Sequence, residues 1–203
     1  MTQPRRCIAT HAPQSDYAPT SSSLLRKLGY DLVPAALAKT PEVRIAREDQ
    51  LGEVPEREIP VITLASRRRR VPSDDPRVVG TVRRPAGLHE LYRLLQLSLE
   101  SHPRAIPRVA CDLAAHAQSA DGDQWDLRVE SLSQNGCLVN GPKLPTLETV
   151  LTMRIEMPWG ERITVPADVA YERREQRGLV FHGITVSVQR RLGKMVLQLL
   201  ERQ

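Results

Sequence analysis

The segments Arg-Ala-Ile-Pro-Arg (residues 104–108) and Ser-Leu-Ser-Gln-Asn-Gly (residues 131–136) decide which fold this chain is expected to adopt. One proline precedes the first segment and another lies inside it, and proline disfavours helical geometry at the residue before it. The first segment is therefore predicted to be an ordered loop that presents Arg104 and Arg108. Guanidinium groups pair with phosphate or with the O6/N7 edge of guanine, and their flat faces stack on purines. This pair of side chains indicates a planar ligand with two negative charges.

The second segment follows a run in which apolar and polar residues alternate, residues 125–130. Alternation with a period of two predicts a half-buried strand, so the segment is expected where this strand ends in a turn. Its serines, Ser131 and Ser133, supply hydroxyl groups that can form hydrogen bonds. Gly136 lacks a side chain and would let the backbone approach a ligand closely.

The rest of the C-terminal half continues the strand pattern and ends in a helix. Alternation recurs in residues 150–157 and 163–171, and an apolar segment follows at residues 177–181. From about Ser187 the apolar residues fall on one face of a predicted helix. That face would either cap the strands, which is the preferred interpretation, or mediate dimers.

These features together resemble the PilZ domain, the bacterial receptor for cyclic di-GMP. That family carries Arg-x-x-x-Arg before its first barrel strand and Asp/Asn-x-Ser-x-x-Gly at a strand end. Arg104 and Arg108 match the first motif, and Ser133 and Gly136 match the second, whereas Ser131 stands at the Asp/Asn position. The resemblance implies a six-stranded antiparallel β-barrel with a C-terminal helix over residues 100–203.

The resemblance also implies a ligand site. Arg104 and Arg108 would bind the phosphates and guanines of cyclic di-GMP, Ser133 would bond to the ligand or brace the turn, and Gly136 would allow the approach. Ser131 has one hydroxyl and cannot accept two guanine N–H bonds as a carboxylate can. Losing one charge-assisted contact costs on the order of 1.5–3 kcal/mol, or about ten- to hundredfold in affinity. We therefore expect weak binding, with an arginine loop that is mobile when free and becomes ordered on the ligand.

The N-terminal half has a different pattern, which predicts a small parallel α/β domain over residues 1–99. Apolar stretches of strand length alternate with segments of helical periodicity. The expected strands are residues 7–9, 31–33, 43–46, 59–64 and 78–82, and the expected helices are residues 24–28 and 88–99. The chain as a whole is thus predicted to be α+β.

This half resembles a response-regulator receiver domain that has lost its acidic residues. Residues 59–66 are similar to the fourth strand with its terminal Thr/Ser, and residues 82–85 to the fifth strand with its Lys-Pro, with Arg84 in place of lysine. Thr10-His11 follows the first strand where receivers place an acidic pair. Alignment on Pro41 puts Arg47 at the phosphorylatable aspartate, with Glu48 and Asp49 nearby. Because Mg²⁺ needs carboxylate ligands, we expect a pseudo-receiver that is not phosphorylated.

Composition limits the classes of function. The chain has 203 residues and a net charge of +5, which favours anionic partners without choosing among nucleotide, nucleic acid and membrane surface. The cysteines at positions 7, 111 and 137 lack metal-ligand spacing and are interpreted as reduced thiols. No signal sequence or apolar run of spanning length is present, so a cytoplasmic protein is expected. No metal site, cofactor or nucleophile with its base is indicated, so no enzymatic activity is predicted.

The leading hypothesis is therefore an effector that binds cyclic di-GMP and then offers a changed surface to an unidentified protein partner. An alternative is a PilZ-fold adaptor that mediates protein contacts without the nucleotide. A third hypothesis is a DNA-binding regulator that uses the four consecutive arginines at residues 67–70. Nucleic acid is the less favoured partner, because no aromatic residues interleave with this run and Asp74 and Asp75 balance it.

Overall fold

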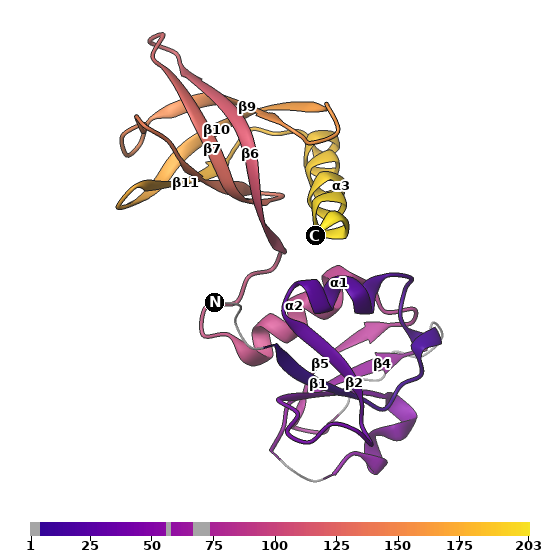
Figure 1. Ribbon diagram of the computed structural model, residues 1–203. Helices are drawn as coiled ribbons and strands as arrows, with labels where there is room; N and C mark the ends of the chain where they lie inside the picture. Colours follow the sequence, from indigo (N-terminus) through magenta and orange to yellow (C-terminus); the bar gives the residue numbers. More distant parts are fainter. Residues whose placement is uncertain (1–4, 56–57, 67–73) are drawn as a thin grey trace. The chain divides into compact units, whose positions relative to one another are not determined.

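The computed structural model describes residues 5–55, 58–66 and 74–203, and the chain divides into two compact units after Pro107 (Figure 1). The four arginines at residues 67–70, on which the DNA-binding hypothesis rests, lie outside the described residues. Each unit is built around its own sheet, which agrees with the predicted α+β class.

The first unit is a five-stranded parallel sheet in the order β2-β1-β3-β4-β5. All five strands expected from the sequence are present: β1 (Arg6–Thr10), β2 (Tyr30–Pro34), β3 (Val43–Arg47), β4 (Val61–Ala65) and β5 (Val78–Arg83). The strand order reverses between β1 and β3, as in doubly wound flavodoxin-like sheets. The central strands β3 and β4 are almost entirely buried, which explains why they appear in the sequence as continuous apolar runs.

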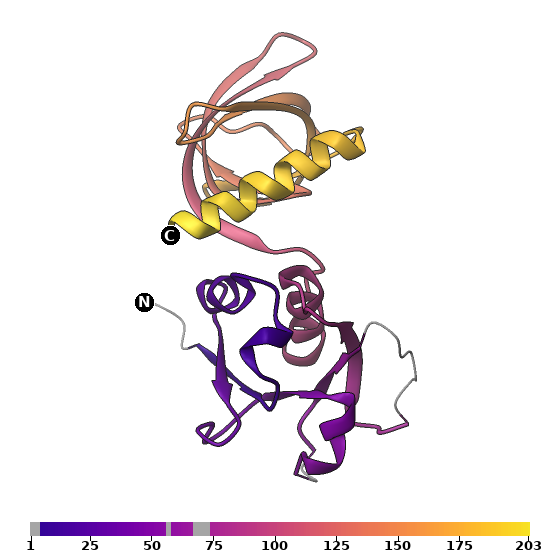
Figure 2. The same ribbon diagram turned by 90° about the vertical axis from the view of Figure 1, so that its right-hand side faces the viewer.

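Helices α1 (Ser21–Lys27) and α2 (Leu88–Leu99) lie side by side over one face of this sheet (Figure 2). The other face is covered by the short helix η2 (Glu48–Glu53), next to a small core of Ala46, Val54 and Val61. A second short helix, η1 (Gln14–Asp16), follows β1. The leucines of α2 predicted to form one apolar face are largely buried, so that face packs into the core.

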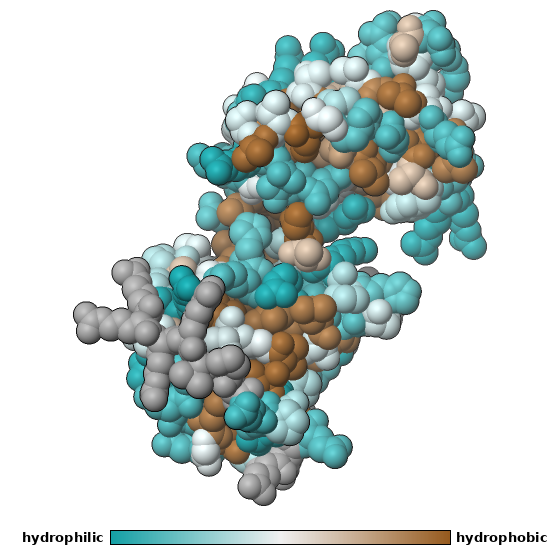
Figure 3. Space-filling view, turned by 180° about the vertical axis from the view of Figure 1, so that it is seen from behind, coloured by the Kyte–Doolittle hydropathy of each residue, from teal (hydrophilic) through white to brown (hydrophobic). Residues whose placement is uncertain are grey.

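The second unit is a closed six-stranded antiparallel barrel in the order β10-β11-β8-β7-β6-β9. Its strands are β6 (Arg108–Ser119), β7 (Gln124–Ser133), β8 (Gly136–Asn140), β9 (Val150–Glu156), β10 (Arg162–Arg173) and β11 (Gln176–Phe181). Buried and exposed residues alternate along β9 and along most of β7 and β10, so apolar side chains fill the interior. On the face shown in Figure 3, the outside of the barrel carries separate apolar patches among polar residues.

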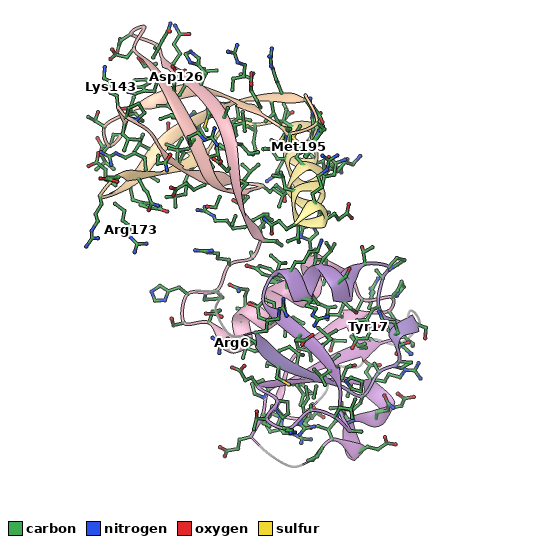
Figure 4. The ribbon with its side chains drawn as sticks, viewed as in Figure 1. Arg6, Tyr17, Asp126, Lys143, Arg173 and Met195 are labelled. Carbon is green, nitrogen blue, oxygen red and sulfur yellow. The ribbon has the colours of Figure 1, made fainter. Side chains whose placement is uncertain are left out.

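The C-terminal helix α3 (Val186–Arg202) packs against β6 and β7. Its buried residues are Leu192, Met195, Val196, Leu199 and Leu200, and Figure 4 marks Met195 on this helix. The apolar face of α3 therefore covers the barrel, which is the preferred of the two roles expected for it. Of the helices described, none is both long enough and apolar enough to cross a bilayer.

Candidate ligand-binding site

The two motif arginines lie in different local structures. Arg104 lies in the irregular segment between α2 and β6, and its side chain is exposed. Arg108 was predicted to lie on the same loop, but this prediction is wrong, because Arg108 is the first residue of β6 and pairs with Ser133 of β7. The loop ends at Pro107, which has no N–H to donate to a strand partner. The division between the two units also falls between the arginines.

Three of the predicted site residues share one cross-strand row of the barrel. Arg108 lies opposite Ser133, Ser133 pairs with Gly136, and Gly136 pairs with Val180 of β11. The row runs through β6, β7, β8 and β11, so residues far apart in the chain become neighbours. Ser131 lies two residues before the end of β7 and pairs with Ala110 and Leu138, not with members of the row.

Ser133 has a structural role at the turn between β7 and β8. Its side chain is buried, and Oγ donates a hydrogen bond to the carbonyl oxygen of Gly136 at 2.9 Å. This bond closes the turn that joins β7 to β8. The backbone N–H of Phe181 also donates to the carbonyl of Asn135 in this turn, at 2.9 Å. This bond shows that Ser133 braces the turn, and the bond expected from Ser133 to a ligand stays a prediction.

Gly136 is needed by the barrel itself. A Cβ atom on this residue would lie 2.2 Å from the carbonyl oxygen of Leu179, which belongs to the neighbouring strand β11. A contact this short with backbone cannot be relieved by moving a flexible side chain. The close pairing of β8 and β11 thus explains a glycine here, independently of any ligand.

Ser131, at the position where the family has Asp or Asn, is partly exposed at an irregular point in the sheet. The pairing register of β7 shifts between Val129 and Ser131, on the side of β8. Glu130 sits at this shift and accepts hydrogen bonds from the side-chain amides of Asn140 and Gln176. Glu130 was not among the predicted site residues, although a carboxylate next to the first position of the motif is a signal present in the sequence.

An open pocket of about 550 Å³ adjoins Glu130. It is lined by Glu130, Asn140, Arg173, Arg174, Glu175 and Gln176, and Figure 4 marks Arg173 on the barrel. Two of its lining residues are basic and two are acidic. The formal charges of its lining residues therefore cancel.

The guanidinium groups of Arg104 and Arg108 make no polar contact with the residues that the structure describes. Within the described residues, neither side chain has a carboxylate within salt-bridge distance or a hydrogen-bond acceptor. By contrast, Arg128 on β7 is held by Asp112 on β6. Burial strongly raises the pKa of the Cys137 thiol, and the positive charge of Arg108 opposes this shift.

The parallel α/β unit contains a cluster of charged residues that was not predicted from the sequence. Asp16 is almost completely buried and accepts two hydrogen bonds from Arg47, from Nε at 2.6 Å and from Nη2 at 3.0 Å. Arg84 adds a third at 3.4 Å. The bond from Arg47, more than any other cause, lowers the pKa of Asp16 below its ordinary value of 3.8. Two cations thus neutralise this carboxylate, and Arg47, at the expected aspartate position, is part of the cluster.

Among the residues that the structure describes, no group of three or more His, Cys, Asp or Glu side chains is arranged to hold a metal ion.

Comparison with protein families identifies the second half of the chain. Residues 101–198 match the family model described as the PilZ domain. These residues form a PilZ domain. The family comprises cyclic di-GMP receptors, which agrees with the resemblance inferred from the motifs. The match includes Arg104 and all the site residues of the barrel, and it leaves the parallel α/β unit uncovered up to residue 100.

Solved structures similar to this chain include PilZ domains. The PilZ domain of CeSA from a cellulose-synthesizing bacterium is 19% identical, with 46% of this chain and 97% of that chain covered and a TM-score of 0.40. The PilZ domain of Escherichia coli YcgR with c-di-GMP is 15% identical, with 50% and 93% covered and a TM-score of 0.43. The K. pneumonia MrkH–c-di-GMP complex is 19% identical, with 50% and 53% covered and a TM-score of 0.42. A search of curated proteins gives no match.

Proposed function

We propose that this protein is a cyclic di-GMP effector whose PilZ domain binds the nucleotide and then signals to a protein partner. The observation that carries the proposal is the state of the two motif arginines. Both belong to a segment that matches a family of nucleotide receptors, and neither has an ionic partner among the described residues. Guanidinium groups without countercharge are ready to bind phosphate.

In this proposal Arg104 and Arg108 bind the phosphates and guanine edges and stack on the bases. Ser131, which is partly exposed, donates or accepts a single hydrogen bond where the family has Asp or Asn. Ser133 and Gly136 contribute by keeping the β7–β8 turn in its closed geometry. The loss of a charge-assisted bond at Ser131 makes the expected affinity about ten- to hundredfold weaker than with a carboxylate.

The signalling step follows from the position of the arginine segment in the chain. The arginine segment joins the α/β domain to the PilZ domain, which were predicted from the sequence to cover residues 1–99 and 100–203. A ligand that binds both arginines restrains this connection, and the restraint alters the surface offered to a partner. The protein acts in the cytoplasm, without catalysis and without a metal cofactor.

Isothermal titration of cyclic di-GMP into the full-length protein tests the proposal. The wild type should release heat, and the Arg104→Ala/Arg108→Ala double variant should release none. The matched control is Arg154→Ala/Arg190→Ala, which removes the same charge from exposed positions on β9 and α3 and should bind as the wild type does. Absence of heat from the wild type would refute the sensing function.

The second candidate is an adaptor that uses the PilZ fold for protein contacts only. Ser131 favours it, because a serine at this position gives up the carboxylate that holds a guanine in the family. A wild type that gives no heat but retains its fold would support the adaptor. DNA binding through residues 67–70 predicts instead a duplex affinity that falls steeply with salt and disappears when the four arginines are neutralised.

A further inference from the structure

Helix α2 contains one buried amide among its leucines. Gln96 is 8% exposed, whereas Arg93 on the same helix is exposed. A buried amide is costly unless both its ends form hydrogen bonds. In Gln96 both do: Nε2 donates to the hydroxyl of Tyr30 at 2.5 Å, and Oε1 accepts from the backbone N–H of Arg104 at 2.9 Å.

The second of these bonds attaches the ligand-binding segment to the α/β unit. Arg104 lies eight residues after Gln96, beyond the end of α2 at Leu99. Its backbone is held while its guanidinium stays exposed and without an ionic partner among the described residues. The start of the same segment is held as well, because Glu100 accepts a hydrogen bond from Arg6 at 3.3 Å.

The other partner of the amide is itself rigid. Tyr30 is 3% exposed, begins β2 and packs edge-on against Tyr92 of α2, with ring centroids 6.1 Å apart. Gln96 thus connects the sheet and α2 with the backbone of Arg104 through two hydrogen bonds. The bond from the Arg104 N–H to Gln96 is therefore a direct connection between this segment and α2.

We propose that Gln96 is a positioning residue that holds Arg104 for the nucleotide and transmits its binding to helix α2. This rests on the proposed function, since it assumes that Arg104 binds cyclic di-GMP. Binding restrains Arg104, the restrained N–H stays bonded to Gln96, and the C-terminal turns of α2 open less often. Without the amide, Arg104 can still reach the ligand, but ordering its backbone then costs free energy at each binding event.

Two variants isolate the bond to Arg104. Gln96→Leu removes both bonds of the amide, whereas Tyr30→Phe removes the Tyr30–Gln96 bond and keeps the bond to Arg104. Gln96→Leu leaves the Tyr30 hydroxyl and the Arg104 N–H without these partners, and Tyr30→Phe leaves Gln96 Nε2 without its partner, so both variants should lose stability. Gln96→Glu is the rescue variant, because a carboxylate accepts from the Arg104 N–H and the Tyr30 hydroxyl can turn to donate to it.

The experiment measures amide hydrogen exchange and cyclic di-GMP affinity on the full chain. In the wild type and in Tyr30→Phe, the Arg104 amide should exchange slowly, and cyclic di-GMP should increase the protection of α2. In Gln96→Leu, the Arg104 amide should exchange fast, the affinity should fall about fivefold and the protection of α2 should be lost. Gln96→Glu should restore the slow exchange of the Arg104 amide, the affinity for cyclic di-GMP and the protection of α2.

The outcomes separate this proposal from the one on which it rests. If the wild type gives no heat with cyclic di-GMP, the sensing function and the coupling through Gln96 fall together. If all variants bind and Gln96→Leu keeps the ligand-induced protection of α2, the coupling alone is wrong. The same holds if Tyr30→Phe loses that protection as completely as Gln96→Leu does, since the loss would then follow from destabilisation of the unit.

Discussion

Replacing Gly136 by alanine should destabilise the barrel even in the absence of ligand. The added Cβ would lie 2.2 Å from the carbonyl oxygen of Leu179, about 1 Å closer than ordinary packing allows. Both atoms belong to paired strands, so the overlap is relieved only if β8 and β11 move apart. Overpacking of this kind costs about 1–3 kcal/mol, and the upper end applies here because the obstacle is backbone.

Tryptophan fluorescence during urea unfolding measures this effect in the correct unit. The chain has two tryptophans, Trp125 and Trp159, and both belong to the barrel unit. The midpoint for Gly136→Ala should fall with little change in the slope of the transition. Gly193→Ala is the matched control, since its Cβ would meet Gln134 at an ordinary 3.5 Å and the residue lies inside α3.

The control should change stability in the opposite direction. Alanine is favoured over glycine in a helix interior by roughly 0.5–1 kcal/mol, so Gly193→Ala should raise the midpoint. If Gly136→Ala unfolds at the wild-type urea concentration, the steric explanation for this glycine is wrong. Its role would then have to come from the ligand.

Three further predictions concern other sites. Ser131→Asp should strengthen cyclic di-GMP binding about ten- to hundredfold by calorimetry, because it restores a charge-assisted contact, and an unchanged affinity would show that this position does not touch the nucleotide. Asp16→Asn should destabilise the α/β unit by roughly 1–3 kcal/mol in circular-dichroism melts, a discounted value because Arg47 reaches solvent. Since the folded pKa of Asp16 lies below its ordinary 3.8, its contribution is complete above that pH and is lost as the pH falls through the folded pKa, so the wild type and the variant should converge in acid. Cys137 is buried and burial strongly raises the pKa of its thiol, whereas Cys111 is half-buried and has its pKa raised to about 11. At pH 8, Cys137 should therefore resist Ellman's reagent until urea is added and Cys111 should react slowly, and prompt reaction of Cys137 would contradict its burial.

Much of the fold was predictable because it is written in local patterns. The alternation in residues 150–157 and 163–171 corresponds to β9 and β10, and the leucine periodicity of residues 88–99 corresponds to α2. These patterns indicate which side of an element is buried, and the period of the buried residues differs between strands and helices. Closure of the barrel came from the family resemblance, since no local pattern specifies which strands are neighbours.

The features that were missed depend on contacts between distant residues. Asp16 and Arg47 are 31 residues apart, and no pattern in the residues next to either one predicts that they form an ion pair. Gln96 sits in a run of leucines, where a polar residue is usually taken for an exposed one. The prediction that Arg108 lies on a loop was wrong for a related reason. The loop was inferred from the neighbouring prolines, but the start of a strand is set by pairing with its partner strand, here at Ser133.

The two motifs do not carry equal weight as evidence for a ligand. Ser133 closes a turn through its bond to Gly136, and Gly136 avoids a collision with Leu179, so a barrel that binds nothing would still need both residues. The side chain of Arg104 is exposed and that of Arg108 is half-buried, and neither has such a structural task among the described residues, so replacing them should cost the fold little. Evidence that distinguishes a nucleotide receptor from an adaptor must therefore come from Arg104, Arg108 and Ser131. Loss of binding in the double arginine variant at unchanged stability is the result that separates them, whereas loss of binding on substituting Ser133 or Gly136 would only report a damaged barrel.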